Sequence, residues 1–266
     1  MTGAEFKSEV PLVRTSVLGV GIAAINLPMA VSLMFEAIQR RQKGYVCVTG
    51  VHGVMEAQRN ERFRKVLNEA FLCTPDGMPM VWMSQIDGQR QVSRVYGPDL
   101  MLEVLQQSEA VGVRQFLYGG HNGTGDLLRR KLLERFPKLQ IVGVYEPPFR
   151  PLNAEEESAL IAQVKQARPD IIWVGISTPK QEFFMSEYLP KLDTVLMVGV
   201  GAAFDIFAGL KRQAPRWMQR SGLEWFFRLC QNPRRLGPRY LRNNPDFAWR
   251  AAMQLAGLKK YPLRKN

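Results

Sequence analysis

The chain has 266 residues, 46% of them hydrophobic, which excludes a disordered protein and allows one large or two small domains with a substantial core. The net charge of +12 lies in residues 210–266, which contain 14 basic and two acidic residues, whereas residues 1–209 contain 22 of each. Three separated cysteines and two histidines argue against a disulfide framework or a zinc site and favour a reducing compartment.

The first apolar segment has two interpretations. From Thr15 to Phe35 there are 21 residues without a charge, which is long enough to span a bilayer. Polar residues and Pro28 interrupt this run, and they favour a strand over Ser16–Ile22 followed by a helix that begins at Leu27. No cleavable signal sequence is expected, because no Ala-x-Ala-like site follows a basic start.

Short apolar runs then alternate with helical patterns. The expected strands are Tyr45–Thr49, Gln115–Tyr118, Gln140–Val144, Ile171–Ile176 and Thr194–Val200. The expected helices are Val54–Ala70, Asp99–Glu109, Thr124–Phe136, Ala154–Ala167 and Gln181–Leu189. This alternation predicts an α/β fold in residues 1–209, with a Rossmann-like, mostly parallel sheet flanked by helices. Residues 210–266 are expected to form a basic helical appendage.

Four glycine-containing loops follow these strands, and in a parallel sheet such loops meet at one edge. They are Gly50–Gly53, Gly119–Gly125, Gly175–Gln181 and Gly199–Asp205. Any one of them could be a plain turn, but four together favour a nucleotide or nucleotide-sugar site. The dinucleotide-binding and P-loop glycine motifs are absent, which argues against a nicotinamide enzyme and a P-loop protein.

One carboxylate stands in an otherwise apolar run: Asp76, between Pro75 and Gly77. A buried carboxylate without a partner costs several kcal/mol or gives up its charge. Asp76 therefore either shapes a turn before glycine or supplies a base.

The order of several motifs resembles the WecG/TagA/CpsF glycosyltransferases, family twenty-six, over about Ser16–Trp249. The motifs are Thr-Pro-Asp76-Gly-Met-Pro, Arg94-Val-Tyr-Gly-Pro-Asp99-Leu, Gly119-Gly, Gly175-Ile-Ser-Thr-Pro-Lys-Gln181-Glu182, Gly199-Val-Gly-Ala-Ala-Phe-Asp205, Ala214-Pro-Arg216-Trp and Gly222-Leu-Glu224-Trp225. The resemblance implies an inverting, metal-independent enzyme. Such an enzyme moves a sugar from a UDP-sugar to an undecaprenyl-diphosphate-linked acceptor, for cell-surface polysaccharides of the exopolysaccharide, teichoic acid or common-antigen type.

The resemblance also implies roles for four residues. Asp76 would be the base that takes the proton of the acceptor hydroxyl, and Thr49 would lie near it. Arg94 would balance the charge of the departing diphosphate, and Gln181 would contact the donor or the acceptor. Structural alternatives stay open for each: a turn aspartate, a strand-end threonine, a solvated arginine and an exposed first-turn glutamine.

Further residues at the loops and in the tail are expected to bind the substrates. They are Gly119, Gly120, Gly175, Lys180, Gly199, Gly201, Asp205, Arg212, Arg216 and Arg220. The chain contains no Asp-x-Asp pair for a divalent ion, so no metal and no cofactor besides the UDP-sugar donor is expected.

One position departs from the family pattern, because His52 lies in the turn where many members carry an asparagine. The transferred sugar is accordingly left open among N-acetylmannosamine, its uronic acid and glucose.

The tail interleaves basic and aromatic residues, notably Trp217, Trp225 and Phe226 among arginines. This pattern is typical of a segment that lies on an anionic membrane surface. Together with the resemblance, which implies transfer at the cytoplasmic face, it predicts a cytoplasmic protein held peripherally on the inner face of the membrane. Two alternatives are packing on the body with diphosphate binding, and a nucleotide- or nucleic-acid-binding module with a phosphate-gripping tail. Nucleic acid is not expected as a partner, and a homo-oligomer is compatible with the sequence.

Overall fold

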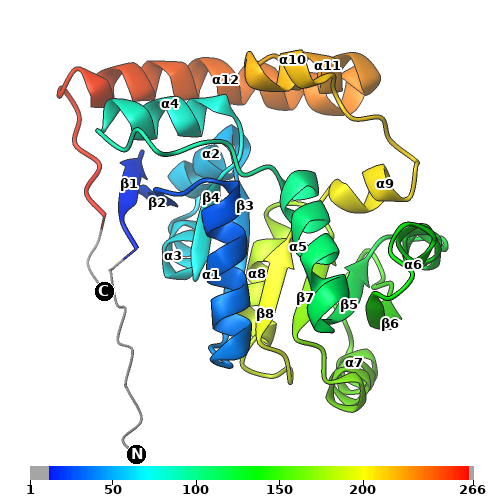
Figure 1. Cartoon of the computed structure of the whole chain (residues 1–266). Helices are drawn as coiled ribbons and strands as arrows, with labels where there is room; N and C mark the ends of the chain where they lie inside the picture. The colour runs from blue at the N-terminus through cyan, green and yellow to red at the C-terminus, as the bar shows by residue number, and fades with distance from the viewer. Residues whose placement is uncertain (1–11, 264–266) are drawn as a thin grey trace, which may run out of the picture.

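The computed structural model describes residues 12–263 of the chain. Its centre is a six-stranded parallel sheet with the strand order β4-β3-β8-β7-β5-β6 (Figure 1). The strands are β3 (Gly44–Thr49), β4 (Leu72–Pro75), β5 (Arg114–Gly119), β6 (Gln140–Tyr145), β7 (Ile171–Gly175) and β8 (Leu196–Gly199). All six carboxyl ends point to the same edge of the sheet, which confirms the α/β architecture expected from the sequence.

Helices cover both faces of the sheet, and the strands are buried between them. One face packs against α1 (Leu27–Gln39), α5 (Gly97–Val111), α6 (Thr124–Arg135) and α9 (Ala203–Phe207). The other packs against α2 (Val51–Arg59), α3 (Glu61–Glu69), α7 (Ala154–Ala167) and α8 (Lys180–Tyr188). This two-sided burial explains why the strands read as continuous apolar runs.

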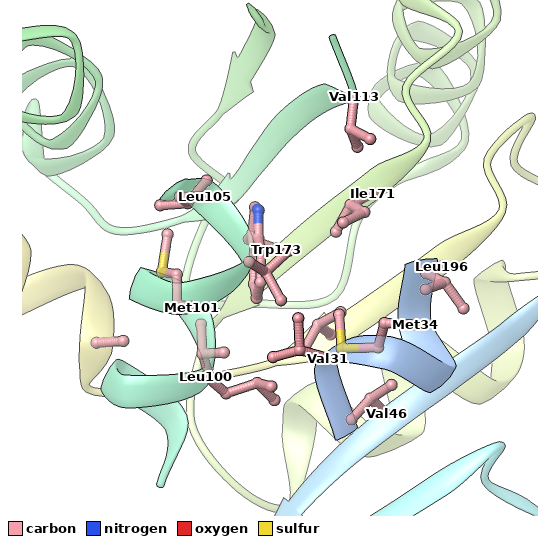
Figure 2. Packing of buried hydrophobic residues seen from close by; sticks show 14 of the residues in the cluster. Val31, Met34, Val46, Leu100, Met101, Leu105, Val113, Ile171, Trp173 and Leu196 are labelled. Atoms are coloured by element: carbon pink, nitrogen blue, oxygen red, sulfur yellow. The ribbon is translucent and has the colours of Figure 1, made fainter. Parts of the chain in front are cut away.

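The core under α1 and α5 contains one polar pair at its centre. Val31 and Met34 of α1 and Leu100 of α5 pack over the strands there (Figure 2). Trp173 of β7 is fully buried, and its indole Nε1 donates a hydrogen bond of 2.7 Å to Oε1 of Gln115, which is also fully buried. The indole N–H and the amide oxygen therefore satisfy each other away from water.

The strand predicted over Ser16–Ile22 is wrong as a single element, because the segment forms a hairpin of β1 (Arg14–Val17) and β2 (Val20–Ala23). Leu18 and Gly19 form its turn with φ angles of 51° and 82°. A leucine rarely adopts a positive φ, so the sequence carries no ordinary turn signal there. The helix expected from Leu27 is confirmed, with its N-terminus capped by Asn26.

The single helix predicted over Val54–Ala70 is also wrong, since Asn60 divides it into α2 and α3. Asn60 has an extended backbone, and its side chain accepts a hydrogen bond from the amide of Phe63 in the first turn of α3. Three further elements of the body were not expected. Two of them, β4 and α4 (Met78–Ile86), stand on either side of Asp76, and the third is α9.

As far as residue 263, the tail forms three helices: α10 (Arg216–Arg220), α11 (Glu224–Gln231) and α12 (Pro233–Leu255). The helix α12 runs across the carboxyl-end edge of the sheet and over α4 (Figure 1). Its far end is fixed to the hairpin by Gln254, whose side chain accepts a hydrogen bond from the amide of Leu18 and donates one to the carbonyl of Ser16. The division into domains 1–209 and 210–266 stays a prediction.

The uncharged run from Thr15 to Phe35 is thus divided between the hairpin and α1. In the part of the chain that the structure describes, every helix is too short or too polar to cross a bilayer.

Candidate functional site

A cleft of about 820 Å³ lies between the carboxyl ends of β3, β4 and β8 and the tail helices. Six Lys or Arg side chains of the described residues line it, against three Asp or Glu side chains. The lining acids are Asp76, Glu182 and Glu224, and the lining bases are Arg94, Lys211, Arg212, Arg228, Arg235 and Arg239. This surplus of positive charge suits an anionic ligand.

Backbone contacts at the end of β4 fix the position of Asp76. Its amide donates a hydrogen bond of 3.0 Å to the carbonyl of Thr49, which extends the pairing of β3 with β4 by one residue. Gly77 then turns the chain with a φ of 90° and starts α4. The Asp76 side chain is directed into the cleft from this turn, with 26% of it exposed.

Arg94 reaches Asp76 because the next segment of the chain returns along β4. The amide of Val95 donates a hydrogen bond of 2.9 Å to the carbonyl of Pro75. Nη2 of Arg94 then lies 3.3 Å from Oδ1 of Asp76. Burial raises the pKa of Asp76, Arg94 opposes that rise, and Glu224 adds to it.

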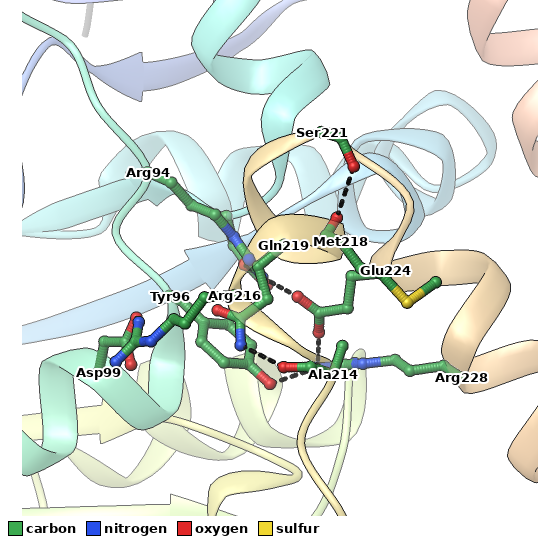
Figure 3. Close-up of polar contacts among 11 residues, drawn as sticks. Arg94, Tyr96, Asp99, Ala214, Arg216, Met218, Gln219, Ser221, Glu224 and Arg228 are labelled. Atoms are coloured by element: carbon green, nitrogen blue, oxygen red, sulfur yellow. Dashed lines mark hydrogen bonds and ion pairs between the residues drawn. The ribbon is translucent and has the colours of Figure 1, made fainter.

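Glu224 of α11 joins the body and the tail inside the cleft. Its carboxylate accepts a hydrogen bond from Arg94 through one oxygen, and its other oxygen lies 2.7 Å from Nη2 of Arg228 (Figure 3). Arg228 also donates a hydrogen bond of 3.0 Å to the hydroxyl of Tyr96, and the guanidinium of Arg94 lies over the ring of Tyr96. The cleft wall is therefore a network of paired charges.

Two buried side chains at the start of α8 face the same cleft. Gln181 and Glu182 are 3% and 1% exposed, and Nε2 of Gln181 donates to Oε1 of Glu182. Oε1 of Gln181 and Oε2 of Glu182 have no hydrogen-bond partner among residues 12–263. Unpaired buried acceptors are rare, so these two atoms are suited to hydroxyl or amide donors of a ligand. Burial raises the pKa of Glu182.

Thr49 also lines the cleft, beside Gly50. Its hydroxyl accepts a hydrogen bond of 3.3 Å from the thiol of Cys73. It also lies 3.4 Å from the carbonyl of Cys47, to which it donates. The hydroxyl is therefore tied to its own strand and its neighbour at the floor of the cleft.

His52 connects α2 to α12 across the cleft. Its Nδ1 lies 3.2 Å from Nδ2 of Asn243. Burial, followed by the positive charge of Arg239, lowers the pKa of His52 to about 4. The histidine is therefore neutral at neutral pH, and its Nδ1 accepts the hydrogen bond from the amide of Asn243.

A sequence model of the glycosyl transferase WecG/TagA/CpsF family matches residues 15–261, which is nearly the whole chain. The chain belongs to this family. Two relatives share 31% identity over 177 residues (Bacillus subtilis) and 30% over 196 residues (Bacillus spizizenii). These stretches cover 66% and 73% of this chain and 67% and 74% of the relatives. Both relatives are named N-acetylglucosaminyldiphosphoundecaprenol N-acetyl-beta-D-mannosaminyltransferase. The chain is thus a glycosyltransferase.

The structure brings seven of the residues singled out from the sequence of this glycosyltransferase to the cleft: Thr49, Asp76, Arg94, Gln181, Gly199, Gly201 and Arg212. Seven others lie outside the lining formed by the described residues: Gly119, Gly120, Gly175, Lys180, Asp205, Arg216 and Arg220. The catalytic and binding roles of all fourteen stay predictions.

Several of the outlying residues have protein partners. Arg216 pairs with Asp99 at 3.0 Å, and Asp205 pairs with Lys211. In the loop that follows Gly119 and Gly120, backbone amides that could bind a phosphate are already bonded to a carboxylate of the protein. The carboxylate of Glu146 accepts hydrogen bonds from the amides of Gly123 and Gly125 there.

The tail contributes cleft residues that were not singled out from the sequence: Glu224, Arg228, Arg235, Arg239 and Asn243. Arg228 follows Glu224 by four positions, and Arg239 follows Arg235 by four. This spacing places each pair on one face of a helix. This i, i+4 spacing is the sequence signal that could have indicated that the members of each pair face the cleft together.

Metal ligation has no preformed candidate in the part of the chain that the structure describes. Among residues 12–263, no three His, Cys, Asp or Glu side chains group closely enough to hold an ion. Independence from metals stays a prediction, to be tested with a chelator.

Proposed function

We propose that this glycosyltransferase transfers a sugar from a UDP-sugar to a sugar carried on a polyprenyl diphosphate, with inversion at the anomeric carbon. The names of both relatives describe transfer to an undecaprenol-diphosphate-linked N-acetylglucosamine. The observation that carries the proposal is the position of Asp76. Its carboxylate is partly buried and lies in a cleft rich in arginine.

Asp76 is the base of the proposed reaction. Its carboxylate takes the proton of the acceptor hydroxyl while that oxygen forms a bond to the anomeric carbon. The bond from the anomeric carbon to the diphosphate oxygen breaks, and UDP leaves with the electron pair. A single displacement of this kind inverts the anomeric configuration. The raised pKa of Asp76, caused first by burial, suits a proton acceptor.

Arginines balance the charge of the departing diphosphate in this proposal. Arg212 and Arg239 come from the tail and line the cleft together with Arg94. Nε of Arg94 is buried and has no hydrogen-bond partner among the described residues, so it can donate to a ligand oxygen. Charge-assisted bonds of this kind are about twice as strong as neutral ones.

The sugar would contact the start of α8. Gln181 and Glu182 line the cleft, and their atoms Oε1 and Oε2, respectively, are buried without a hydrogen-bond partner among the described residues. A sugar hydroxyl or acetamido N–H that reached them would satisfy them. These two acceptors favour a substrate with adjacent polar donors.

We also propose that the tail places the cleft at the surface of an anionic bilayer. Trp217, Trp225 and Trp249 are 63%, 41% and 68% exposed on the tail helices. Exposed tryptophans among arginines are typical of a surface that rests at the lipid headgroups. A lipid-linked acceptor would then reach the cleft from the bilayer.

The test is a transfer assay with purified protein, an N-acetylglucosaminyl polyprenyl diphosphate and a panel of UDP-sugars, run with and without a chelator. The expected result is a disaccharide-linked lipid from one UDP-sugar, formed equally in both conditions. If a divalent ion must be added back, the metal-independent part of the proposal fails. If the protein instead binds oligonucleotides in a salt-sensitive manner and transfers nothing, the nucleic-acid alternative replaces it.

A further inference from the structure

Glu224 has an unusual position for an acid, because it lies within a strongly basic tail and inside the cleft. The tail contains only two acids, Glu224 and Asp246. Asp246 pairs with Arg250 one turn away on the same helix. Glu224 instead reaches across to the body, where its carboxylate meets Arg94, 130 positions away in the sequence. It is 8% exposed.

Arg94 is shared between two carboxylates. The same nitrogen, Nη2, contacts Oε2 of Glu224 and lies 3.3 Å from Oδ1 of Asp76. The contact with Glu224 is the shorter of the two. Since one guanidinium has a single positive charge, each carboxylate reduces what the other receives. Glu224 therefore competes with Asp76 for Arg94.

We propose that Glu224 is a positioning residue of the transfer reaction: it draws Arg94 towards itself and so weakens the ion pair between Arg94 and Asp76, and Asp76 thereby keeps its capacity to accept a proton. This inference rests on the proposed role of Asp76 as the base. Without Glu224, the positive charge of Arg94 would no longer be shared, and its ion pair with Asp76 would become stronger. The tail thus contributes a residue on which the reactivity of the body depends.

The groups that face this pair of carboxylates come from several elements. They are Arg94 and Tyr96 from the loop before α5, Arg228 from α11 and Tyr240 from α12. Arg239 of α12 and His52 of α2 line the same cleft. Tyr96 and Tyr240 have pKa values raised by burial, and His52 is neutral above about pH 4. In the range where carboxylates titrate, the two arginines that contact Glu224 keep their charge.

The electrostatics of Asp76 agree with this geometry. Burial raises its pKa, the positive charge of Arg94 lowers it, and the negative charge of Glu224 raises it again. Removing the charge of Glu224 should affect the pKa of Asp76 in two ways: it removes a neighbouring negative charge, and it leaves the positive charge of Arg94 to Asp76 alone. Both changes lower the pKa of Asp76.

A second contact allows Glu224 to be changed without releasing the tail. Arg228 donates a hydrogen bond to the hydroxyl of Tyr96, so α11 remains attached to the body through this pair. Glutamine has the shape of glutamate and lacks its charge, so Glu224→Gln is the informative variant. Asp246→Asn removes the other acid of the tail and is its matched control.

The test is an NMR titration of the ¹³C-labelled aspartate carboxyl groups, with the Asp76 signal assigned through Asp76→Asn. We expect the titration midpoint of Asp76 to fall in Glu224→Gln and to match the wild type in Asp246→Asn. Glu224→Asp keeps the charge on a shorter side chain, so its midpoint should lie between those of the wild type and Glu224→Gln.

The proposal is overturned if the Asp76 midpoint is the same in Glu224→Gln and the wild type, or if it rises. Should Glu224→Gln fail to fold, Glu224→Asp decides alone, and a midpoint equal to the wild type then counts against the proposal. The titration needs no turnover, so it can fail or succeed independently of the transfer reaction.

A kinetic measurement then connects the carboxyl group to the reaction. In Glu224→Gln, kcat should fall on the order of tenfold, with little change in KM for the donor, and the acidic limb of the pH profile should move to lower pH. If the substitution only destabilised the fold, KM for the donor would rise and the acidic limb of the pH profile would not move. Such a result would also count against the proposal.

Discussion

Nδ1 of His52 and Nδ2 of Asn243 lie 3.2 Å apart, and this contact joins α2 to the middle of α12. Nδ2 of an asparagine can only donate, so Nδ1 of His52 must be the acceptor and cannot carry a proton. Burial and the nearby Arg239 lower the pKa of His52 to about 4 and keep it in that state. One of the contacts between the body and the tail thus depends on a neutral histidine.

This neutral histidine predicts a pH-dependent stability. Between pH 6.5 and about pH 4 the unfolded chain binds a proton on His52 that the folded chain does not bind. The free energy of unfolding should therefore be fully retained above pH 6.5. It should decrease by on the order of 3 kcal/mol as the pH falls through this window.

Urea unfolding at pH 7 and pH 4.5, with wild type and His52→Asn, measures the effect. Asparagine offers an uncharged acceptor near the position of Nδ1, so the variant should lose less stability than the wild type on acidification. Equal losses in the two proteins would show that other groups cause the change.

Asp76→Asn tests the proposed base. An amide cannot accept the proton of the acceptor hydroxyl, so kcat should fall on the order of 100-fold to 10,000-fold. Donor affinity should stay close to that of the wild type, because Arg94 and the other arginines remain. Calorimetry with UDP and a transfer assay give the two values. A variant with full turnover would exclude the base role.

Gly50→Ala tests how closely the turn after β3 and the turn after β4 must approach. A Cβ at Gly50 would lie 2.7 Å from the backbone oxygen of Asp76. Because backbone cannot move aside cheaply, Asp76 should shift and stability should fall by about 1–3 kcal/mol. Transfer should fall by about 100-fold, since a displacement of about 1 Å can have that effect.

Gly237→Ala is the control for this variant. Gly237 lies inside α12, and apart from its chain neighbours a Cβ there would first meet Cδ1 of Leu229 in α11, at 4.0 Å. The substitution should leave transfer unchanged. Its effect on stability should be small, because the helix propensity gained over glycine is opposed by crowding of the new Cβ against Pro238, which follows it. If Gly50→Ala behaves like this control, the close approach has no consequence for the site.

Trp217→Ser with Trp249→Ser tests the proposed membrane surface. Both side chains are exposed on tail helices, so their loss should weaken binding to vesicles that contain phosphatidylglycerol by roughly tenfold per residue. Phe149→Ser, which removes an exposed aromatic side chain from the body, is the control. Co-sedimentation measures the binding. A tail that rests on lipid should also detach at high salt.

Trp173→Phe tests the polar pair in the core. The change leaves Oε1 of Gln115 buried without its 2.7 Å donor and opens a small cavity. The free energy of unfolding should fall by about 3 kcal/mol. Adding Gln115→Met removes the orphaned oxygen and should restore part of the loss. A double variant less stable than Trp173→Phe would contradict this account.

Periodicity was sufficient to predict the parallel sheet and most of its helices, because two-sided burial makes each strand a continuous apolar run. Periodicity failed where the backbone conformation of a single residue set the boundary of an element. Leu18 adopts a positive φ at the hairpin turn, and Asn60 interrupts a helical pattern by capping the next helix. The short strand β4 ends in a proline, and its pattern is too brief to distinguish from a loop.

The candidate site was predictable only where its residues lie in motifs. Asp76 and Arg94 could be singled out 18 positions apart because family motifs carry them both. Glu224 could be aligned but not assigned a partner, since Arg94 lies 130 positions away. Contacts between the tail and the body depend on how α11 and α12 pack over the sheet edge, and a local pattern does not contain that information.

The strand order has a consequence for how the molecule is made. β3 (Gly44–Thr49) lies between β4 and β8 (Leu196–Gly199), and most of the chain separates β3 from β8. During synthesis on the ribosome, the edge of β3 stays open until β8 has emerged. Such long-range pairing slows folding and leaves apolar strands exposed to aggregation. We therefore expect the nascent protein to need chaperones until its last strand is translated.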